Sequence, residues 1–99
     1  MSEVTYLEIT VNDLLKLSNP KIIDIRNGQK YSDNHIPGAI NISFRQLMSF
    51  PEKYLNKGDT YYIYCQMGAT SLHASRVLRA LGYKVISVKG GYEDYILGK

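Results

Sequence analysis

Residues 59–82 read DTYYIYCQMGATSLHASRVLRALG, and this stretch decides the fold. The aromatic run at residues 61–64 predicts a buried strand, and residues 71–81 predict an amphipathic helix. The apolar positions of that helix recur with helical spacing: Ala74, Val77, Leu78 and Leu81. Gly82 follows at the place where a glycine commonly ends a helix. A strand, the short loop 65–70 and a helix together form one repeating unit of a parallel α/β sheet.

The rest of the chain continues the same alternation of short apolar runs and amphipathic stretches. Four more strands are predicted, at residues 4–9, 21–25, 39–42 and 84–88. Shorter helices are predicted from Thr10, within residues 28–34, over residues 44–50 and over residues 92–97. The helix that begins at Thr10 is expected to turn Leu14, Leu15 and Leu17 inward, and Pro51 is expected to end the helix at 44–50. Right-handed crossovers then give an α/β domain of three layers, with helices on both faces of a five-stranded parallel sheet.

Length and composition limit the class of protein. The chain has 99 residues and a mass of 11.3 kDa, which predicts one domain over residues 1–99. Hydrophobic residues make up 44% and charged residues 21%, as in ordinary globular domains, so disorder is not expected. The net charge of +3 is weak and dispersed, which argues against a nucleic-acid partner, and the nine tyrosines are interpreted as packing residues rather than a base-stacking set.

The N-terminal sequence and the hydropathy pattern give an expected location. No apolar run is long enough to span a membrane, so no membrane partner is expected. The first residues, MSEVTYLEIT, have neither a basic start nor an apolar stretch, and no signal peptide is predicted. The protein is therefore expected in the cytoplasm, with a monomer favoured.

Cys65 is the single cysteine, so an internal disulfide and a multi-cysteine metal site are both impossible. It is either a small buried hydrophobic residue or a nucleophile. It follows a predicted parallel strand, at the sheet edge where α/β proteins bind ligands. The loop after it can curl so that backbone N–H groups point inward, and the next helix adds its positive end. Both features favour the thiolate and lower the pKa of the Cys65 thiol.

Four motifs, in order along nearly the whole chain, resemble the single-domain rhodanese-like sulfurtransferases. The first is Ile23-Asp24-Ile25-Arg26, and the second is Tyr31 followed by His35-Ile36-Pro37-Gly38-Ala39-Ile40-Asn41-Ile42. The third is the loop from Cys65 to Thr70, which is similar to an active-site loop of the form Cys-x-x-Gly-x-Thr. The fourth is Gly90-Gly91-Tyr92 with Tyr95 three residues on.

The resemblance implies a sulfurtransferase in which Cys65 is the catalytic nucleophile. Cys65 would take a sulfane sulfur from a donor such as thiosulfate, become a persulfide, and pass the sulfur to cyanide, a small thiol or a protein thiol. The substrate-binding residues implied are those that follow it: Gln66, Met67, Gly68, Ala69, Thr70 and Ser71. Neither a metal nor an organic cofactor is implied. The alternative is a rhodanese-like interaction or sulfur-relay module with little turnover of its own.

The loop departs from the family pattern at two places. Many relatives that use thiosulfate have a basic residue just after the cysteine, whereas this chain has Gln66 and Met67. A neutral loop attracts a dianion weakly, so a low-molecular-weight or protein-bound persulfide becomes a plausible donor. Thr70 stands where many bacterial relatives have arginine, and its hydroxyl would either contact sulfur or cap the helix.

Other chemistries fit less well. Cysteine-dependent phosphatases need an arginine six residues after the cysteine, but that position is Ser71 and the next arginine is Arg76. A thiol redox sensor would lack a second cysteine to resolve a sulfenic acid. Four roles are expected for the remaining polar residues. His73 is expected on the surface, and His35 is expected to form a hydrogen bond within the Ile36-Pro37-Gly38 turn. Asp24 and Arg26 are expected to form a structural ion pair, and a substrate contact by Arg45 is the less favoured interpretation of that residue.

Overall fold

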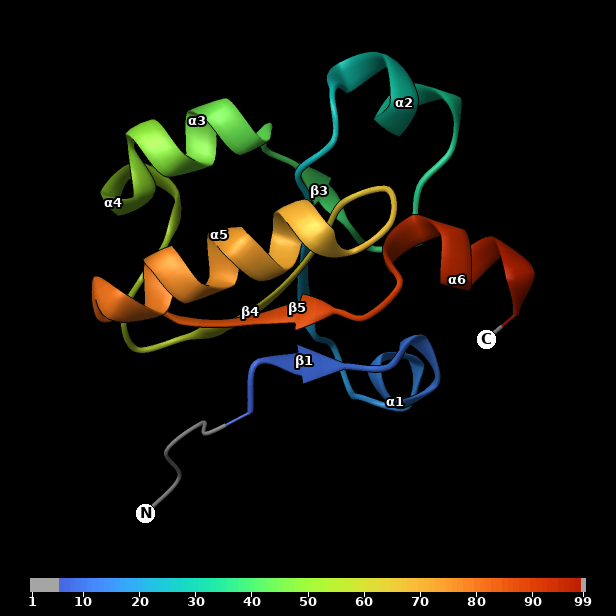
Figure 1. Cartoon of the computed structure of the whole chain (residues 1–99), viewed down its shortest axis with the longest axis horizontal. Coiled ribbons are helices and arrows are strands. Elements are labelled where there is room, and N and C mark those ends of the chain that lie inside the picture. The colour runs from blue at the N-terminus through green and yellow to red at the C-terminus, as the bar shows by residue number, and fades with distance from the viewer. Residues whose placement is uncertain (1–5, 99) are drawn as a thin grey trace.

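The computed structural model describes residues 6–98. Its central feature is a five-stranded sheet in the order β1-β5-β4-β2-β3, in which every pair of neighbours is parallel (Figure 1). The strands are β1 (Glu8–Ile9), β2 (Lys21–Asp24), β3 (Ile40–Asn41), β4 (Thr60–Tyr64) and β5 (Lys84–Val88). The helices are α1 (Val11–Leu15), α2 (Gly28–Asp33), α3 (Phe44–Ser49), α4 (Pro51–Tyr54), α5 (Ala69–Ala80) and α6 (Gly91–Leu97). The predicted α/β class and five-stranded parallel sheet are confirmed.

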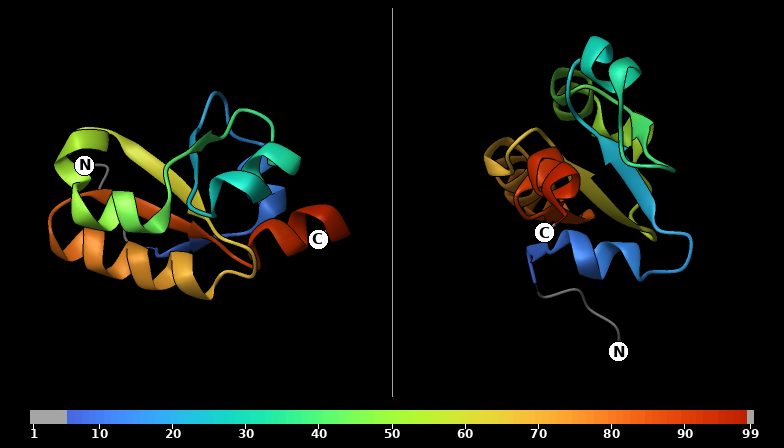
Figure 2. Two further views of the ribbon diagram at one scale, coloured as in Figure 1. Left: turned by 90° about the horizontal axis from the view of Figure 1, so that it is seen from above. Right: turned by 90° about the vertical axis from the view of Figure 1, so that its right-hand side faces the viewer.

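Helices cover both faces of the sheet because successive strand residues alternate between two cores. Ile23 of β2 and Ile63 of β4 are register partners, and both pack with Leu78 of α5. On the other face, Tyr64 packs with Leu14 of α1 and Tyr92 of α6. Figure 2 shows α5 and α1 on different sides of the strands. Cys65, the residue after β4, belongs to the core on the α5 side. None of the described helices is long and apolar enough to cross a membrane.

Three expectations about residues 4–51 need correction. β1 contains only Glu8 and Ile9, whereas the predicted strand at 4–9 began earlier; residues 4 and 5 lie outside the described part of the chain. Leu14 is buried as predicted, but Leu15 and Leu17 are 56% and 39% exposed, because Leu15 lies about 100° around α1 from Leu14 and Leu17 follows the end of the helix. Pro51 begins α4. Backbone N–H groups at the start of a helix have no partner within the helix, so the N–H that proline lacks costs nothing there, and α3 has already ended at Ser49.

The central helix also differs at both ends from its prediction. α5 begins at Ala69, two residues earlier than predicted, and so takes Ala69 and Thr70 out of the loop. Its N-cap is Gly68 in a left-handed conformation, which lets the chain turn directly from the loop into the helix. At the other end Leu81 is 52% exposed rather than part of the buried face. Helical spacing alone did not show that the helix ends at Ala80, before Leu81.

Candidate active site

Cys65 lies at the carboxyl end of β4, the central strand, and its side chain is only 8% exposed. The next three residues curl around the sulfur. The backbone N–H of Gly68 donates to Cys65 Sγ at 3.1 Å, and the N–H of Ser71 donates to it at 3.3 Å. The Ser71 hydroxyl oxygen is 3.4 Å from the same sulfur. The predicted nest of inward-pointing N–H groups therefore surrounds the thiol, at the N-terminal end of α5.

These contacts act against burial on the pKa of Cys65. Burial raises the pKa, because it penalises the charged thiolate. Hydrogen bonds from the Ser71 hydroxyl and from the backbone N–H groups of Ser71, Gly68 and Met67 lower it, and they outweigh burial. The net result is a pKa below the ordinary value of a thiol. The site thus stabilises negative charge on sulfur with dipoles rather than with a cationic side chain.

The first turn of α6 holds the loop in this shape. The N–H of Tyr92 donates to the carbonyl oxygen of Cys65 at 2.9 Å, and the N–H of Glu93 donates to that of Gln66 at 3.0 Å. Gly91 lies so close that a Cβ added to it would stand 2.4 Å from the Cys65 carbonyl oxygen. Figure 1 shows the loop between β4 and α5 beside the start of α6. Two segments far apart in sequence therefore form one backbone unit.

Gln66 braces the loop from its outer side. Arg26 donates through Nη1 to Gln66 Oε1 at 3.1 Å, and Gln66 Nε2 donates to Glu93 Oε2 at 2.9 Å. Both ends of the Gln66 amide are therefore occupied by neighbours in the fold. This arrangement leaves the side chain less free for a substrate than the sequence suggested.

Arg26 is in turn held by a buried carboxylate. Its Nη2 lies 2.8 Å from Asp24 Oδ2, with both side chains almost inaccessible to solvent. Burial lowers the pKa of the Arg26 guanidinium, but the hydrogen bond and charge of Asp24 outweigh this effect and raise it. The Tyr64 hydroxyl donates to Asp24 Oδ2 at 2.7 Å, and the Arg26 guanidinium lies 4.2 Å from the centre of the Tyr92 ring. The structural role predicted for the Asp24–Arg26 pair is confirmed.

Comparison with known proteins identifies the family. The family model described as the Rhodanese-like domain matches residues 10–97. The chain belongs to the rhodanese family. The resemblance stated from the four sequence motifs is thus confirmed, and the match places the chain among sulfurtransferases and sulfur-relay domains.

Individual relatives of this rhodanese domain match over most of their length. Thiosulfate sulfurtransferase PspE of Escherichia coli (strain K12) is 32% identical over 78 residues, 78% of this chain and 75% of that protein. Thiosulfate sulfurtransferase GlpE of Coxiella burnetii is 30% identical over 94 residues, 94% of this chain and 85% of that protein. A rhodanese-related protein from Thermoplasma volcanium superposes with a TM-score of 0.85 at 26% identity, covering 94% of this chain and 93% of that one. In three longer relatives the chain matches only 14% to 25% of the length.

The six residues predicted to bind substrate fall into different positions in this rhodanese domain. Gly68 and Ser71 contact Cys65 Sγ directly, and Ser71 is fully buried beneath it. Met67 contributes its N–H to the thiol while its side chain is 74% exposed. Ala69 and Thr70 are exposed in the first turn of α5. Thr70 is not the helix cap, because that position is Gly68, and its hydroxyl makes no hydrogen bond within residues 6–98.

The other polar residues singled out from the sequence make no hydrogen bond to the Cys65 sulfur within residues 6–98. His73 is exposed on α5, as predicted. His35 does not hydrogen-bond within the Ile36-Pro37-Gly38 turn; its Nδ1 lies 2.8 Å from the Tyr31 carbonyl oxygen and its ring stacks on Tyr31. The exposed side chain of Arg45 makes no hydrogen bond or ion pair within the described residues. The same residues contain no group of three or more His, Cys, Asp or Glu side chains placed to hold a metal ion.

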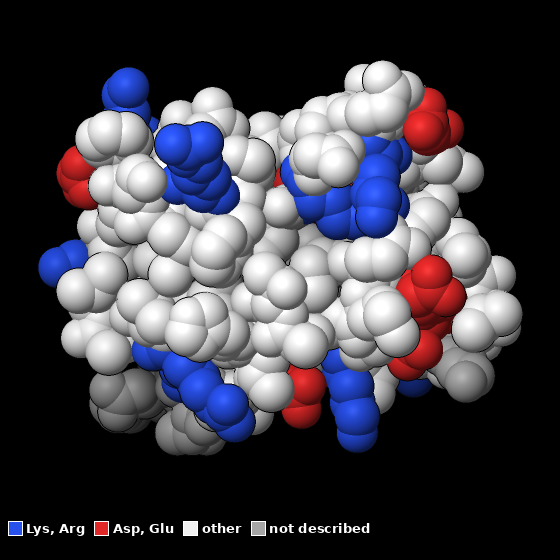
Figure 3. Space-filling view, turned by 45° about the horizontal axis from the view of Figure 1, so that its top comes forward, with Lys and Arg blue, Asp and Glu red and all other residues white. Residues whose placement is uncertain are grey.

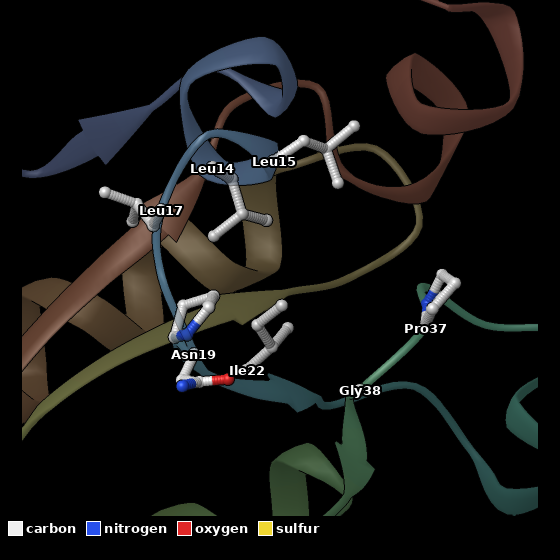
Figure 4. Close-up of a pocket in the computed structure, with 8 residues that line it drawn as sticks. Leu14, Leu15, Leu17, Asn19, Ile22, Pro37 and Gly38 are labelled. Carbon is white, nitrogen blue, oxygen red and sulfur yellow. The ribbon is translucent and has the colours of Figure 1, made fainter.

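One cavity of the rhodanese domain lies away from Cys65, which does not line it. It has a volume of about 410 Å³ and lies at the amino end of β2, at the sheet edge opposite the thiol. Figure 4 shows that Leu14, Leu15 and Leu17 line one side and Ile22, Pro37 and Gly38 the other. No titratable side chain lines it. This cavity has no group for acid–base or nucleophilic chemistry, so the candidate site is the Cys65 loop.

Sequence reasoning missed Ser87, Glu93 and the hydroxyl of Tyr64. Ser87 is fully buried in β5 and lies 2.7 Å from Ser71, oxygen to oxygen. One signal was present: Ser87 is the single polar residue in the apolar run Val85–Val88, and a buried hydroxyl needs a partner. The roles of Glu93 and Tyr64 depend on contacts between segments that no local pattern encodes.

Proposed function

We propose that residues 1–99 form one rhodanese domain that transfers a sulfane sulfur through a persulfide on Cys65. The observation that supports this most strongly is the set of N–H donors from Met67, Gly68 and Ser71 around Cys65 Sγ. An anionic sulfur is needed both before and after the transfer. Fixed dipoles stabilise such charge without reorganising during the reaction.

The reaction consists of two displacements at sulfur. The Cys65 thiolate attacks the sulfane sulfur of the donor and forms an S–S bond, while the remainder of the donor leaves with the bonding electron pair. When thiosulfate is the donor, the part that leaves is sulfite. An external thiolate or cyanide then attacks the outer sulfur of the persulfide, and Cys65 leaves as a thiolate. Because the chain has no second cysteine, the acceptor has to come from outside it.

The charge around the loop favours a persulfide over thiosulfate as the donor. The exposed rim consists of Met67, Ala69 and Thr70, none of which is charged. Two cations lie near the loop: Arg26 already pairs with Asp24 and donates to Gln66, and Lys30 lines the same hollow as Asp33. On the face drawn in Figure 3, basic side chains stand in several separate groups on a mostly uncharged surface. A dianionic donor therefore finds little net attraction at the mouth of the site.

Intact mass measurement tests the proposal directly. We expect the protein to gain one sulfur atom after incubation with glutathione persulfide, more slowly with thiosulfate, and to lose it on addition of cyanide. Cys65→Ser should remain folded and gain none. A wild-type protein that takes up no sulfur from either donor would refute the proposed activity. Steady-state rates with both donors, compared side by side, test the order of preference.

A non-catalytic interaction module is the second candidate. The observation in its favour is the 74% exposed, apolar side chain of Met67 beside the buried thiol, since isolated apolar side chains of this kind contribute to protein contacts. If this function is correct, Cys65→Ala retains full affinity for the partner and full activity in cells. If sulfur transfer is correct, the same variant loses activity and Met67→Ala weakens only the transfer to a protein acceptor.

A further inference from the structure

Two buried serine hydroxyls lie in a row beneath the Cys65 sulfur. Ser71 Oγ, on α5, is 3.4 Å from Cys65 Sγ and 2.7 Å from Ser87 Oγ, on β5. Both serines are 0% exposed, so water does not compete for these contacts. Within residues 6–98, Ser71 is the hydrogen-bond partner of the Ser87 hydroxyl. The row therefore runs from the sheet, through the helix, to the nucleophile.

The number of hydroxyl hydrogens restricts the directions in which the hydrogen bonds of this row can run. The Ser71 hydroxyl has one hydrogen but three neighbours: Cys65 Sγ, Ser87 Oγ and the Gly68 carbonyl oxygen at 3.2 Å. A thiolate has no hydrogen, so its contact with Ser71 is favourable only if Ser71 donates to sulfur. The short contact with Ser87 is then favourable only if Ser87 donates to Ser71. The Gly68 carbonyl does not depend on Ser71, because it also accepts the N–H of Leu72 at 3.0 Å.

We propose that Ser87 is a positioning residue for the nucleophile: its hydroxyl donates to Ser71 Oγ and so directs the Ser71 hydroxyl at the Cys65 sulfur. The proposal rests on the proposed function of Cys65, which it deepens. No proton passes between the serines. Each hydroxyl rotates about its C–O bond, and the proton lost by the thiol goes to solvent. Because hydrogen bonds in a chain polarise one another, the second donor strengthens the first.

Other groups around the sulfur would not transmit a change at Ser87 to the reactivity of Cys65. Arg26 and Glu93, the charged side chains nearest in the hydrogen-bond network, both end on the Gln66 side chain. His73, on the helix that packs over the site, is exposed. The remaining donors to the sulfur, from Gly68 and Ser71, are backbone N–H groups and do not involve the side chain of residue 87. A change in thiol reactivity on removing the Ser87 hydroxyl is thus a change transmitted through Ser71.

The test measures the rate of alkylation of Cys65 by iodoacetamide as a function of pH. For Ser87→Ala we expect the midpoint of the profile to move to higher pH, with a rate about two- to tenfold lower on its acid side and an unchanged limiting rate at high pH. Ser71→Ala should also move the midpoint of the profile to higher pH. Ser75→Ala is the matched control, because its hydroxyl lies one turn further along α5, buried and without a hydrogen-bond partner among the described residues. Its profile should coincide with that of the wild type.

A second pair of variants keeps the test valid if Ser87→Ala is unstable. Threonine and valine have the same shape and differ by one hydroxyl, so Ser87→Thr should keep the wild-type midpoint and Ser87→Val should shift it. Equal profiles for Ser87→Thr and Ser87→Val, or an equal shift for Ser75→Ala, would overturn the proposal.

The alkylation of Cys65 does not require sulfur transfer, so the two proposals can fail separately. If the wild type is alkylated normally but accepts no sulfur from thiosulfate or glutathione persulfide, the proposed function fails while the role of Ser87 stands.

Discussion

At the residue scale, Cys65 shows how a buried thiol can still ionise readily. Burial alone would keep it neutral, but the donors that surround it are fixed by the fold before the reaction begins. Two of them, the N–H groups of Gly68 and Ser71, flank the beginning of α5. The shape of the loop therefore matters more for reactivity than the identity of its exposed side chains.

Gly68 is the residue on which that shape depends. Its φ of +105° is strained for any other residue, and an added Cβ would lie 3.0 Å from the N atom of Gly90. We expect Gly68→Ala to lower the free energy of unfolding by about 1–2 kcal/mol in urea titrations, and to slow the alkylation of Cys65.

Gly38→Ala is the control for this prediction. Gly38 has a φ of +89° but no atom within 4 Å of an added Cβ, so it isolates the backbone strain from crowding at the site. Gly38→Ala should lower stability and leave the alkylation rate unchanged. Equal effects of the two variants on alkylation would mean that Gly68 has no special connection with the thiol.

The lowered pKa of Cys65 also makes stability depend on pH. At low pH the thiol is protonated in both the folded and the unfolded state and contributes nothing. As pH rises through the lowered folded pKa toward the unfolded value of about 8.5, ionisation stabilises the fold increasingly, and above that value the contribution is constant. The stability of the wild type relative to Cys65→Ala should follow this curve. Urea titrations from about pH 6 to pH 9.5 under reducing conditions measure it, and a difference that falls with rising pH contradicts the assignment.

At the element scale, strands and helices were predictable wherever local patterns determine them. The apolar runs at β2, β4 and β5 and the spacing of Ala74 and Leu78 depend only on neighbours in sequence. The ends of the elements were predicted less accurately. For example, α5 begins after Gly68, which lies against Gly90 from a distant part of the sequence. In the same way, the position of Cys65 at a strand end was predictable. Ser87 stands out in the sequence only as a polar residue in an apolar run, and its partner was not predictable because Ser71 belongs to a different element.

The ion pair at the end of β2 gives a prediction at this scale. Asp24→Asn leaves the Arg26 guanidinium charged and unpaired in a buried position, and should cost about 3 kcal/mol of stability. The double variant Asp24→Asn with Arg26→Met removes that unpaired charge and should be less destabilised than the sum of the two single changes. Urea titrations of the three variants give the coupling energy. The exposed pair of Lys16 and Asp13 is the control, and Lys16→Gln should have almost no effect. Additive effects at Asp24 and Arg26 would show that the pair is not coupled.

At the scale of the whole molecule, the two edges of the sheet are chemically different. The carboxyl edge gathers the Asp24–Arg26 pair, Cys65 and the Gly90-Gly91 turn, which are widely separated in sequence but hydrogen-bonded into one network. The amino edge holds an apolar cavity without titratable groups. The parallel sheet thus concentrates polar chemistry at one edge, but the exposed residues of the Cys65 loop, Met67, Ala69 and Thr70, add no charge there.

This distribution of charge predicts that one local cation will change donor preference where overall charge does not. Met67→Lys places a positive charge on the exposed rim beside Cys65, and should raise kcat/KM for thiosulfate about three- to tenfold at low salt, with the gain diminishing as ionic strength rises. The rate with a less charged persulfide donor should change less. Leu15→Lys is the control, because Leu15 is 56% exposed at the opposite edge and adds the same net charge. Equal gains for both variants would mean that long-range attraction to the whole molecule, rather than the neutral loop, limits the use of thiosulfate.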